Sequence, residues 1–242
     1  MINVVIPMAG LGSRFSLKGY DLPKPFIDVN GKPMIKRVLE NINLKNGNYI
    51  LIARKEHIEK NEDIILDIKN NFNVKIIEID YLTEGTANTV LLARKLIQTQ
   101  DPLLIANSDQ IIDIDINDFI KDSQKRNLDG SILCFKNINK DPKWSYAKLN
   151  SENLVIEVKE KKAISDLATV GIYFFEKGLD FINGAIDMIA RKDKVNNEYY
   201  TCPVYNYLIN SEKKIGIFEI HPEQMHGIGT PEDLDLFLNQ SK

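Results

Sequence analysis

Several residue types that are typical of metal-binding or disulfide-rich proteins are scarce in this sequence. Its 242 residues include only two cysteines, three histidines and one tryptophan. Cys134 and Cys202 lie far apart, and the histidines show no spacing typical of metal ligands, so we expect no zinc site. Such sparse cysteines fit a reducing compartment, and we expect the protein to act in the cytoplasm.

Long apolar runs and an excess of positive charge are also missing. No apolar run approaches the roughly 18 residues that a membrane-spanning helix needs, and no basic segment followed by an apolar run opens the chain. The net charge of −3 provides no general basic surface, so we expect neither nucleic acid nor a membrane as a partner. The composition, 43% hydrophobic and 27% charged, is that of an ordinary globular protein large enough for one ample domain.

The strongest pattern lies in the first 30 residues. An apolar run at residues 2–7 predicts a buried strand, and a turn with two glycines follows it. Gly10 and Gly12 allow positive φ and close approach, so backbone N–H groups can surround phosphate oxygens, and Arg14 adds a fork of donors. A dinucleotide fingerprint is excluded because Phe15 stands where its third glycine belongs, and the Gly-Lys-Ser/Thr of a P-loop does not follow. A tight turn with a solvated arginine remains the alternative.

Lys24 strengthens the phosphate interpretation. It lies between Pro23 and Pro25, and a residue before proline is pushed towards extended rather than helical geometry. Its side chain therefore projects from a stiff backbone, which a lysine needed only for solvation does not require. An arginine on a glycine turn, with a rigid lysine ten residues later, predicts a clamp for a triphosphate.

Strands and helices alternate through the first half of the chain. Strands are expected at 49–53, 74–79 and 103–107, and helices at 33–43, 58–69 and 86–98. This alternation predicts a mostly parallel sheet in three layers. The second half contains more strands, at 131–135, 146–149, 155–159 and 169–175, followed by helices at 179–189 and after the N-cap Thr230.

A possible metal ligand follows the apolar run at 103–107. In open α/β sheets the ligand lies beyond the carboxyl ends of the strands, and Asp109 comes just after such an end. A carboxylate there is well placed for Mg²⁺, which prefers hard oxygen ligands; a turn or cap residue is the alternative. Asp113 and Asp115 are expected to be exposed residues of an edge strand or turn rather than ligands.

The segment Ala9-Gly10-Leu11-Gly12-Ser13-Arg14, followed by Pro23-Lys24-Pro25, resembles the signature of the sugar-phosphate nucleotidyltransferases, or nucleoside-diphosphate-sugar pyrophosphorylases. The resemblance implies a Rossmann-like, GT-A-like three-layer α/β/α fold with a mixed, mostly parallel sheet and a smaller β-rich acceptor-binding part. It implies one domain over residues 1–242, with the nucleotide bound by 1–115 and the acceptor by 116–242. The implied activity is Mg²⁺-dependent transfer of a nucleoside monophosphate from a nucleoside triphosphate to a phosphorylated small molecule, with release of pyrophosphate.

The resemblance also implies roles for particular residues. Those implied to bind the nucleotide are Ala9, Gly10, Leu11, Gly12, Ser13, Glu84, Gly85 and Thr86. Those implied to act in catalysis are Arg14 on the β- and γ-phosphates, Lys24 beside the α-phosphorus and Asp109 on Mg²⁺. Those implied to bind the acceptor are Lys161, Gly171 and Glu198, although Lys161 could equally belong to a solvated face. From the residues alone, Thr86 is expected to cap its helix, and Gly85 to let a flat group lie against the backbone.

Two positions depart from the family pattern. Lys162 stands where the family has the proline of Glu-Lys-Pro, and Gly227 stands where an aspartate usually precedes the Gly-Thr-Pro segment. That aspartate is the family's second metal ligand. Two interpretations follow: Asp109 and the phosphates hold the metal without it, or Glu198 or another acid replaces it.

The resemblance covers essentially the whole chain and can be narrowed. The opening Pro7-Met8-Ala9-Gly10, the segment Trp144-Ser145-Tyr146 and residues 164–173 and 198–206 are similar to a compact subgroup from bacterial capsule and surface-polysaccharide loci. Within it the chain most resembles the CTP:phosphoglutamine cytidylyltransferases of capsular phosphoramidate synthesis, which implies CTP and phosphoglutamine as substrates. Two alternatives remain: a hexose-1-phosphate nucleotidyltransferase with the same mechanism, and a non-catalytic nucleotide-binding regulatory module.

Overall fold

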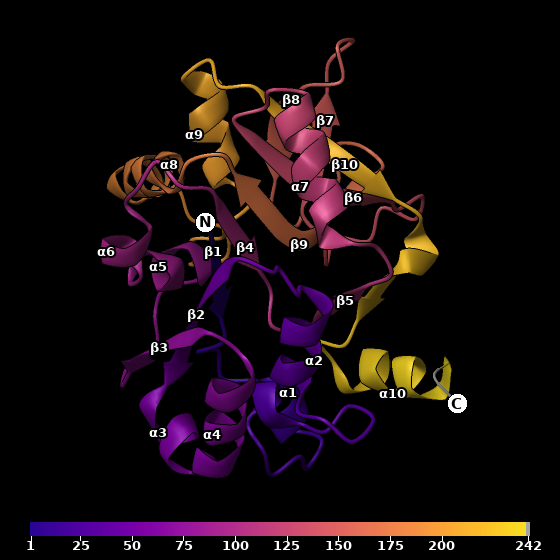
Figure 1. Ribbon diagram of the computed structural model, residues 1–242. Helices are drawn as coiled ribbons and strands as arrows, with labels where there is room; N and C mark the ends of the chain where they lie inside the picture. The colour runs from indigo at the N-terminus through magenta and orange to yellow at the C-terminus, as the bar shows by residue number, and fades with distance from the viewer. Residues whose placement is uncertain (241–242) are drawn as a thin grey trace.

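A mixed, mostly parallel sheet runs through the centre of the computed structural model, which describes residues 1–240 (Figure 1). Along the sheet its strands are β10 (Ile215–Ile220), β6 (Gly130–Lys136), β9 (Leu167–Phe175), β4 (Leu103–Ala106), β1 (Ile2–Pro7), β2 (Gly47–Arg54) and β3 (Val74–Ile79). Neighbours on this path are parallel except at β9, which is antiparallel to both β4 and β6. Strands β7 (Tyr146–Leu149) and β8 (Val155–Lys159) extend the sheet beside β9. The predicted fold class is confirmed.

Helices cover both faces of the sheet because its buried strands are apolar on both sides. In β1, Val4 and Ile6 pack into one hydrophobic core while Val5 packs into the other. The first core contains residues of α2 (Met34–Asn41), α3 (Lys55–Glu59), α4 (Glu62–Asn71) and α7 (Ile116–Lys125). The second contains residues of α5 (Thr86–Leu91), α6 (Arg94–Ile97), α8 (Gly178–Ala190) and α9 (Val204–Asn210). None of the helices within residues 1–240 is long and apolar enough to cross a bilayer.

A third, smaller core joins the two ends of the chain. Phe15, from the short helix α1 (Ser13–Ser16), packs with Ile228 and with Leu234 of the last helix α10 (Pro231–Gln240). The 3₁₀ turn η1 (Lys24–Phe26) follows α1 in the chain. A separate two-stranded sheet pairs β5 (Gln110–Ile112) with β11 (Met225–Gly227), which follows η2 (Pro222–Gln224). The opening loop and residues 227–233 both line the cleft beside the carboxyl ends of β1 and β4.

Some elements differ from those expected from the sequence. Local hydrogen bonds explain where two of the expected helices divide. The helix expected at 58–69 is two helices, because the Asn61 amide donates to the His57 carbonyl (2.8 Å) and ends α3. The helix expected at 86–98 divides at Ala93, whose N–H donates to Val90, three residues back, and tightens the turn. Helices α7 and α9 and strand β10 were not predicted. The N-cap expected at Thr230 is confirmed, since its hydroxyl accepts from the Asp233 N–H at 3.0 Å.

Candidate active site

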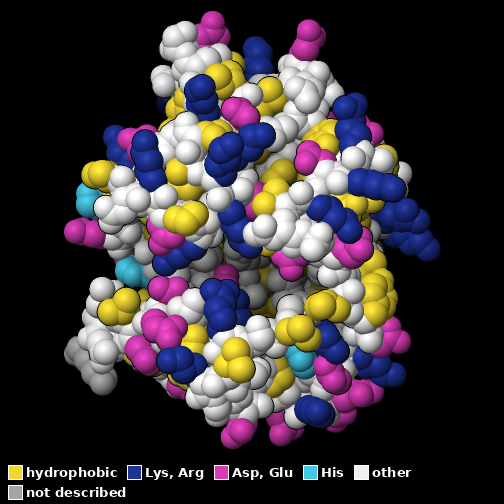
Figure 2. All heavy atoms as spheres, turned by 180° about the vertical axis from the view of Figure 1, so that it is seen from behind, with side chains coloured by type: hydrophobic (Ala, Val, Ile, Leu, Met, Phe, Trp, Pro, Cys, Tyr) yellow, Lys and Arg dark blue, Asp and Glu magenta, His cyan; other side chains and the backbone are white. Residues whose placement is uncertain are grey.

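A cleft of about 840 Å³ opens at the carboxyl ends of β1 and β4. One wall comes from the loop after β1, from η1 and from residues 107–110 and 227–233; the other comes from 143–145, 160–161, β9 and 198–202. Figure 2 shows a hollow across the face opposite that of Figure 1, with basic and acidic side chains at its rim. Polar groups that are distant in the sequence therefore meet in one cleft at these strand ends.

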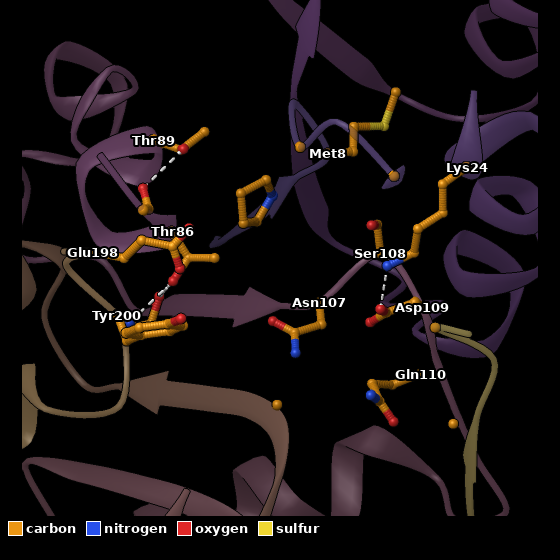
Figure 3. Close-up of a pocket in the computed structure, with 18 of the residues that line it drawn as sticks. Met8, Lys24, Thr86, Thr89, Asn107, Ser108, Asp109, Gln110, Glu198 and Tyr200 are labelled. Atoms are coloured by element: carbon orange, nitrogen blue, oxygen red, sulfur yellow. Dashed lines mark hydrogen bonds and ion pairs between the residues drawn. The ribbon is translucent and has the colours of Figure 1, made fainter. Parts of the chain in front are cut away.

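Lys24 and Asp109 form an ion pair inside this cleft (Figure 3). Their side chains are only 17% and 15% exposed, so the pair is shielded from bulk water. Lys24 begins η1 directly after Pro23, and the Asp109 carbonyl accepts the Ile228 N–H at 2.9 Å, so both backbones are fixed. The two predicted catalytic residues are brought together, and the ammonium neutralises the carboxylate that is expected to hold a cation.

The glycine loop lies beside this pair and offers donors without partners. Gly12 has φ +64°, and a Cβ there would lie 2.9 Å from the Cβ of Lys24, so only glycine lets the loop approach the lysine this closely. The guanidinium of Arg14 makes no hydrogen bond or ion pair with any residue among 1–240 and lines the cleft. Leu11 is 57% exposed and lies outside the cleft, whereas the other predicted members of the loop line it, namely Ala9, Gly10, Gly12 and Ser13.

The segment at 84–86 has a different local role from the one expected. Gly85 has φ +113°, and a Cβ there would lie 2.5 Å from the Tyr199 carbonyl oxygen, so this side of the glycine is filled by backbone rather than open to a flat ligand. The Tyr199 N–H donates to the Glu84 carbonyl at 2.7 Å. Gly85, not Thr86, is the N-cap of α5, and the Thr86 hydroxyl instead accepts from the Thr201 N–H at 3.1 Å. Residues 84–86 therefore anchor the loop at 199–201.

Glu84 itself is turned away from the cleft. Its carboxylate pairs with Lys194 at 3.1 Å, and it is not among the cleft-lining residues, which do include Gly85 and Thr86. Of the three residues expected to face base and ribose, the structure therefore brings only the last two to the cleft. Glu84 contributes through its backbone carbonyl.

On the opposite wall, Lys161 lies with two carboxylates. The Lys161 ammonium donates to the Tyr200 hydroxyl at 2.6 Å and lies 4.7 Å from the centre of that ring. The Glu160 carboxylate accepts a hydrogen bond from Ser145. Burial raises the pKa of Glu160, the Ser145 hydrogen bond and the Lys161 charge oppose that rise, and the charge of Glu198 adds to it. Lys161 and Glu198 thus lie together, with Glu160 as a third charged member.

The pKa of the Tyr200 phenol is also raised. Burial is the largest cause, and a hydrogen bond to Glu198 and the charges of Glu198 and Glu160 add to it. The phenol therefore remains a neutral hydrogen-bonding group between a cation and two anions. The stretch 196–206, which includes Tyr200, was expected either to line an acceptor pocket or to be a packed surface loop. Ser145 and Glu160 were not predicted as site residues, because a glutamate within a run of charged residues resembles a solvated surface.

Gly171 allows the two halves of the sheet to meet at the cleft. It lies in β9 with φ +92°, and a Cβ there would lie 2.3 Å from the Asn107 side-chain nitrogen. The Asn107 N–H donates to the Gly171 carbonyl at 2.9 Å. Gly229 does the same for Asp109, since a Cβ at Gly229 would lie 2.4 Å from the aspartate oxygen. Both glycines serve close packing around polar side chains of the cleft.

Asp109 fits a magnesium site in which the protein provides one carboxylate ligand. Mg²⁺ is commonly held by one or two carboxylates together with substrate phosphates. Within residues 1–240 no group of three or more His, Cys, Asp or Glu side chains is arranged to hold a metal. Glu198, one candidate for the second ligand, lies across the cleft from Asp109 (Figure 3). The structure therefore does not bring these two carboxylates together.

The comparison with known families shows the family of this chain. Residues 3–204 match the family described as Nucleotidyl transferase. The chain belongs to the nucleotidyl transferase family. Members of this family bind nucleoside triphosphates and sugar-phosphate acceptors and generally use a divalent metal such as Mg²⁺.

The chain is also similar to individual proteins. It is 30% identical over 177 residues to the bifunctional protein GlmU of Methanococcus aeolicus, covering 72% of this chain and 40% of that protein. It is 25% identical over 240 residues to D-glycero-alpha-D-manno-heptose 1-phosphate guanylyltransferase of Campylobacter jejuni, covering 98% and 99%. The chain spans about half the length, or less, of the archaeal GlmU proteins that it matches.

Solved structures share the fold. The nucleoside-diphosphate-sugar pyrophosphorylase of Vibrio cholerae superimposes with a TM-score of 0.82 at 24% identity, covering 98% of this chain and 100% of that one. The similarity at this identity concerns the fold, and it includes the layers on both sides of the cleft.

Proposed function

We propose that this chain is a Mg²⁺-dependent enzyme that transfers a nucleoside monophosphate from a nucleoside triphosphate to a phosphorylated small molecule and releases pyrophosphate. The observation that carries the proposal is the pairing of the cleft walls. Arg14, Lys24 and Asp109 stand on one wall, and Lys161 with its acidic neighbours stands on the other. In this proposal residues 1–115 bind the nucleotide and residues 116–242 bind the acceptor.

The chemistry requires positioning and charge neutralisation rather than a base. An oxygen of the acceptor phosphate attacks the α-phosphorus, the bond between the α-phosphorus and the bridging oxygen breaks, and pyrophosphate leaves with that electron pair. A phosphate monoester has its second pKa near 6, so the attacking oxygen already carries charge at neutral pH. Two anions must therefore be held together while negative charge develops, which fixed cations and donors accomplish.

Each cation has a separate part in this scheme. Arg14 and the N–H groups of the glycine loop bind the β- and γ-phosphates, and Lys24 moves from Asp109 to the oxygens of the α-phosphate. Lys161 holds the acceptor phosphate. Bound Mg²⁺, held by Asp109, supplies additional neutralisation of the triphosphate charge.

We further propose CTP and phosphoglutamine as the substrates, giving CDP-L-glutamine in a cytoplasmic step of capsular polysaccharide modification. Support comes from the mixed charge of the acceptor wall. Phosphoglutamine carries a phosphoryl group and a carboxylate, which suit Lys161, and an ammonium group, which suits Glu160 and Glu198. A sugar phosphate without an amino group carries no cation for this pair of carboxylates.

A hexose-1-phosphate or heptose-1-phosphate acceptor is the second candidate. The heptose 1-phosphate guanylyltransferase of Campylobacter jejuni matches almost the full length of this chain. Glu160 and Glu198 would then accept hydrogen bonds from sugar hydroxyls.

Pyrophosphate release tests these alternatives. The protein would be assayed with Mg²⁺ and each of CTP, UTP, GTP, ATP and dTTP, first with phosphoglutamine and then with hexose- and heptose-1-phosphates. Release with CTP and phosphoglutamine alone would support the narrow proposal, and release with a sugar phosphate would replace it with the second candidate. Nucleotide binding without release in any combination would favour a non-catalytic regulatory module.

Charge-removing variants would test the acceptor wall. Glu160→Gln and Glu198→Gln should each raise KM for phosphoglutamine about tenfold while leaving KM for CTP nearly unchanged, since a charged hydrogen bond to ammonium is lost. Glu157→Gln on β8, whose carboxylate pairs with Lys159 at 3.4 Å, is the matched control. A rise in KM for CTP instead would remove these residues from the acceptor site.

A further inference from the structure

Gln110 carries a buried oxygen that has no partner. The residue is 7% exposed and lines the cleft, and within residues 1–240 its side-chain oxygen accepts no hydrogen bond. Buried amide oxygens are nearly always paired in native proteins, so an unpaired one at a cleft wall points to a ligand. Nothing in the scheme above uses this group.

The side chain lies on the same wall of the cleft as Asp109. Gln110 follows Asp109 directly and begins β5, and Figure 3 shows both side chains projecting from the same wall into the cleft. The terminal torsion of a glutamine amide is soft, so its carbonyl oxygen can turn towards a ligand beside Asp109. An amide carbonyl is a hard oxygen donor of the kind that Mg²⁺ and Mn²⁺ accept.

Gly227 leaves space beside this amide. It is the register partner of Gln110 in the antiparallel pair of β5 and β11, so a side chain at 227 would share a face with Gln110. A Cβ at Gly227 would lie 3.8 Å from the Gln110 oxygen and 3.9 Å from Trp144, which is ordinary contact. The position is therefore free for a ligand atom that residue 227 does not provide.

Other carboxylates of the cleft are engaged elsewhere. Asp233 lines the same wall but pairs with Lys143 at 3.7 Å. Glu160 accepts from Ser145, and Glu198 lies on the opposite wall. Asp109 is left without a second carboxylate, and Gln110 is the adjacent oxygen donor.

We propose that the side-chain oxygen of Gln110 is a second protein ligand, beside the Asp109 carboxylate, for the divalent cation. The proposal rests on the metal dependence within the proposed function and is independent of CTP and phosphoglutamine. A site with one carboxylate and one neutral oxygen carries one negative charge less than a site with two carboxylates. The cation therefore binds weakly to the free protein and strongly when it arrives with a triphosphate.

Manganese binding without turnover tests this assignment. Mn²⁺ would be titrated into the full chain with CTP present and no acceptor, and into the same concentration of CTP alone. Free Mn²⁺ would be measured by electron paramagnetic resonance, and the difference between the two titrations reports binding to the chain. Gln110→Ala, and Gln110→Met, which keeps the side-chain length, should each weaken Mn²⁺ binding about tenfold, because one oxygen ligand is lost. Gln110→Glu should tighten it by a similar factor, because the ligand gains a charge.

A compensating substitution and a control sharpen the test. Gly227→Asp in the Gln110→Ala background should restore Mn²⁺ affinity, since a carboxylate then enters the vacant position. Asp233→Asn should leave affinity unchanged. The assignment is overturned if Gln110→Met binds Mn²⁺ like the unmodified chain, or if Asp233→Asn causes the loss instead.

The binding readout separates this inference from the wider proposal. Chains that bind Mn²⁺ with CTP, UTP or GTP but release no pyrophosphate would leave the Gln110 assignment testable and end the catalytic proposal. A chain that binds no Mn²⁺ with any of these nucleotides would overturn both.

Discussion

Lys24 and Asp109 are mutually neutralised before any ligand arrives. A cation that binds Asp109 must displace the lysine, and the displaced ammonium is then available to a phosphate. Because Asp109 exchanges one cation for another, its buried carboxylate is not left unpaired. The pair is thus a state that substrate binding rearranges.

Replacing Lys24 should separate catalysis from metal binding. Lys24→Met should lower kcat by a factor of about 10²–10³, the usual effect of removing one group that stabilises transition-state charge. It should also tighten Mn²⁺ binding to the nucleotide-free chain, because the competitor for Asp109 is gone. Pyrophosphate release and Mn²⁺ titration measure the two effects. Lys32→Met, which removes a lysine paired with Glu40 at 2.7 Å, is the control, and near-normal turnover of Lys24→Met would refute the role.

A methyl group at Gly171 should destabilise the fold. Gly171→Ala places a side chain at φ +92° and drives its Cβ to 2.3 Å from Asn107. We expect the free energy of unfolding to fall by about 3 kcal/mol, measured by urea denaturation. Gly10→Ala, where a Cβ would meet nothing within 4 Å, should change it by less than about 1 kcal/mol. Equal effects of the two substitutions would contradict the packing argument.

The sequence indicates some candidate site residues and conceals others for a physical reason. Arg14, Lys24 and Asp109 follow from local chemistry, namely a glycine turn, flanking prolines and a strand end. Gln110 has no such context, because an oxygen without a partner is visible only once its surroundings are known. Glu160 is concealed because its burial depends on Ser145 and the loop at 198–202, which are distant in sequence.

At the scale of elements, the pair of β5 and β11 holds Asp109 in place. Ile228 donates to its carbonyl, and Gly229 lies against its carboxylate. Leu234 of α10, packed on Phe15, fixes this connection to the opening loop. The segment from Ile228 to Leu234 thereby positions Asp109, which follows the end of β4.

A substitution at Gly229 should lower activity more than it lowers stability. Gly229→Ala places a Cβ 2.4 Å from the Asp109 oxygen, and the flexible carboxylate rather than the backbone would move. We expect kcat/KM to fall at least about tenfold, with the free energy of unfolding lowered by less than about 1 kcal/mol. Kinetics and urea unfolding on the same preparation give both values. Unchanged kcat/KM would show that Asp109 does not need its present position.

Element prediction succeeded where local periodicity dominates. The strands at Val74–Ile79, Tyr146–Leu149 and Val155–Lys159 were predicted to the residue. The direction of β9 could not be predicted, because hydrophobic alternation carries no information on whether a neighbour is parallel. The site depends on this direction, since β9 brings Gly171 to Asn107.

At the scale of the whole molecule, one hydrophobic core contains several buried cysteine and tyrosine side chains whose ionisation is disfavoured. Burial raises the pKa of Cys134, Cys202, Tyr173 and Tyr205. A raised pKa favours the protonated form in the folded state. Below the ordinary values of 9.0 for cysteine and 10.0 for tyrosine both states are protonated, and stability is unaffected.

The protein should therefore lose stability in alkali. Above about pH 9 the unfolded chain releases protons that the folded chain retains, so the free energy of unfolding falls by about 1.4 kcal/mol per pH unit for each ionising group. Urea unfolding between pH 7 and pH 11 measures this slope. Cys134→Ala should reduce the slope near pH 9–10, and a free energy constant up to pH 11 would exclude the mechanism.

The antiparallel strand β9 connects the two halves of the central sheet. It is hydrogen-bonded to β4 on one side and to β6 on the other, so one continuous sheet supports the loops that form the two walls of the cleft. Such a sheet has no hinge between the place of the donor and the place of the acceptor. We therefore expect strand register to set the distance between the proposed nucleotide and acceptor sites, so that an acceptor reacts only if its length matches this distance.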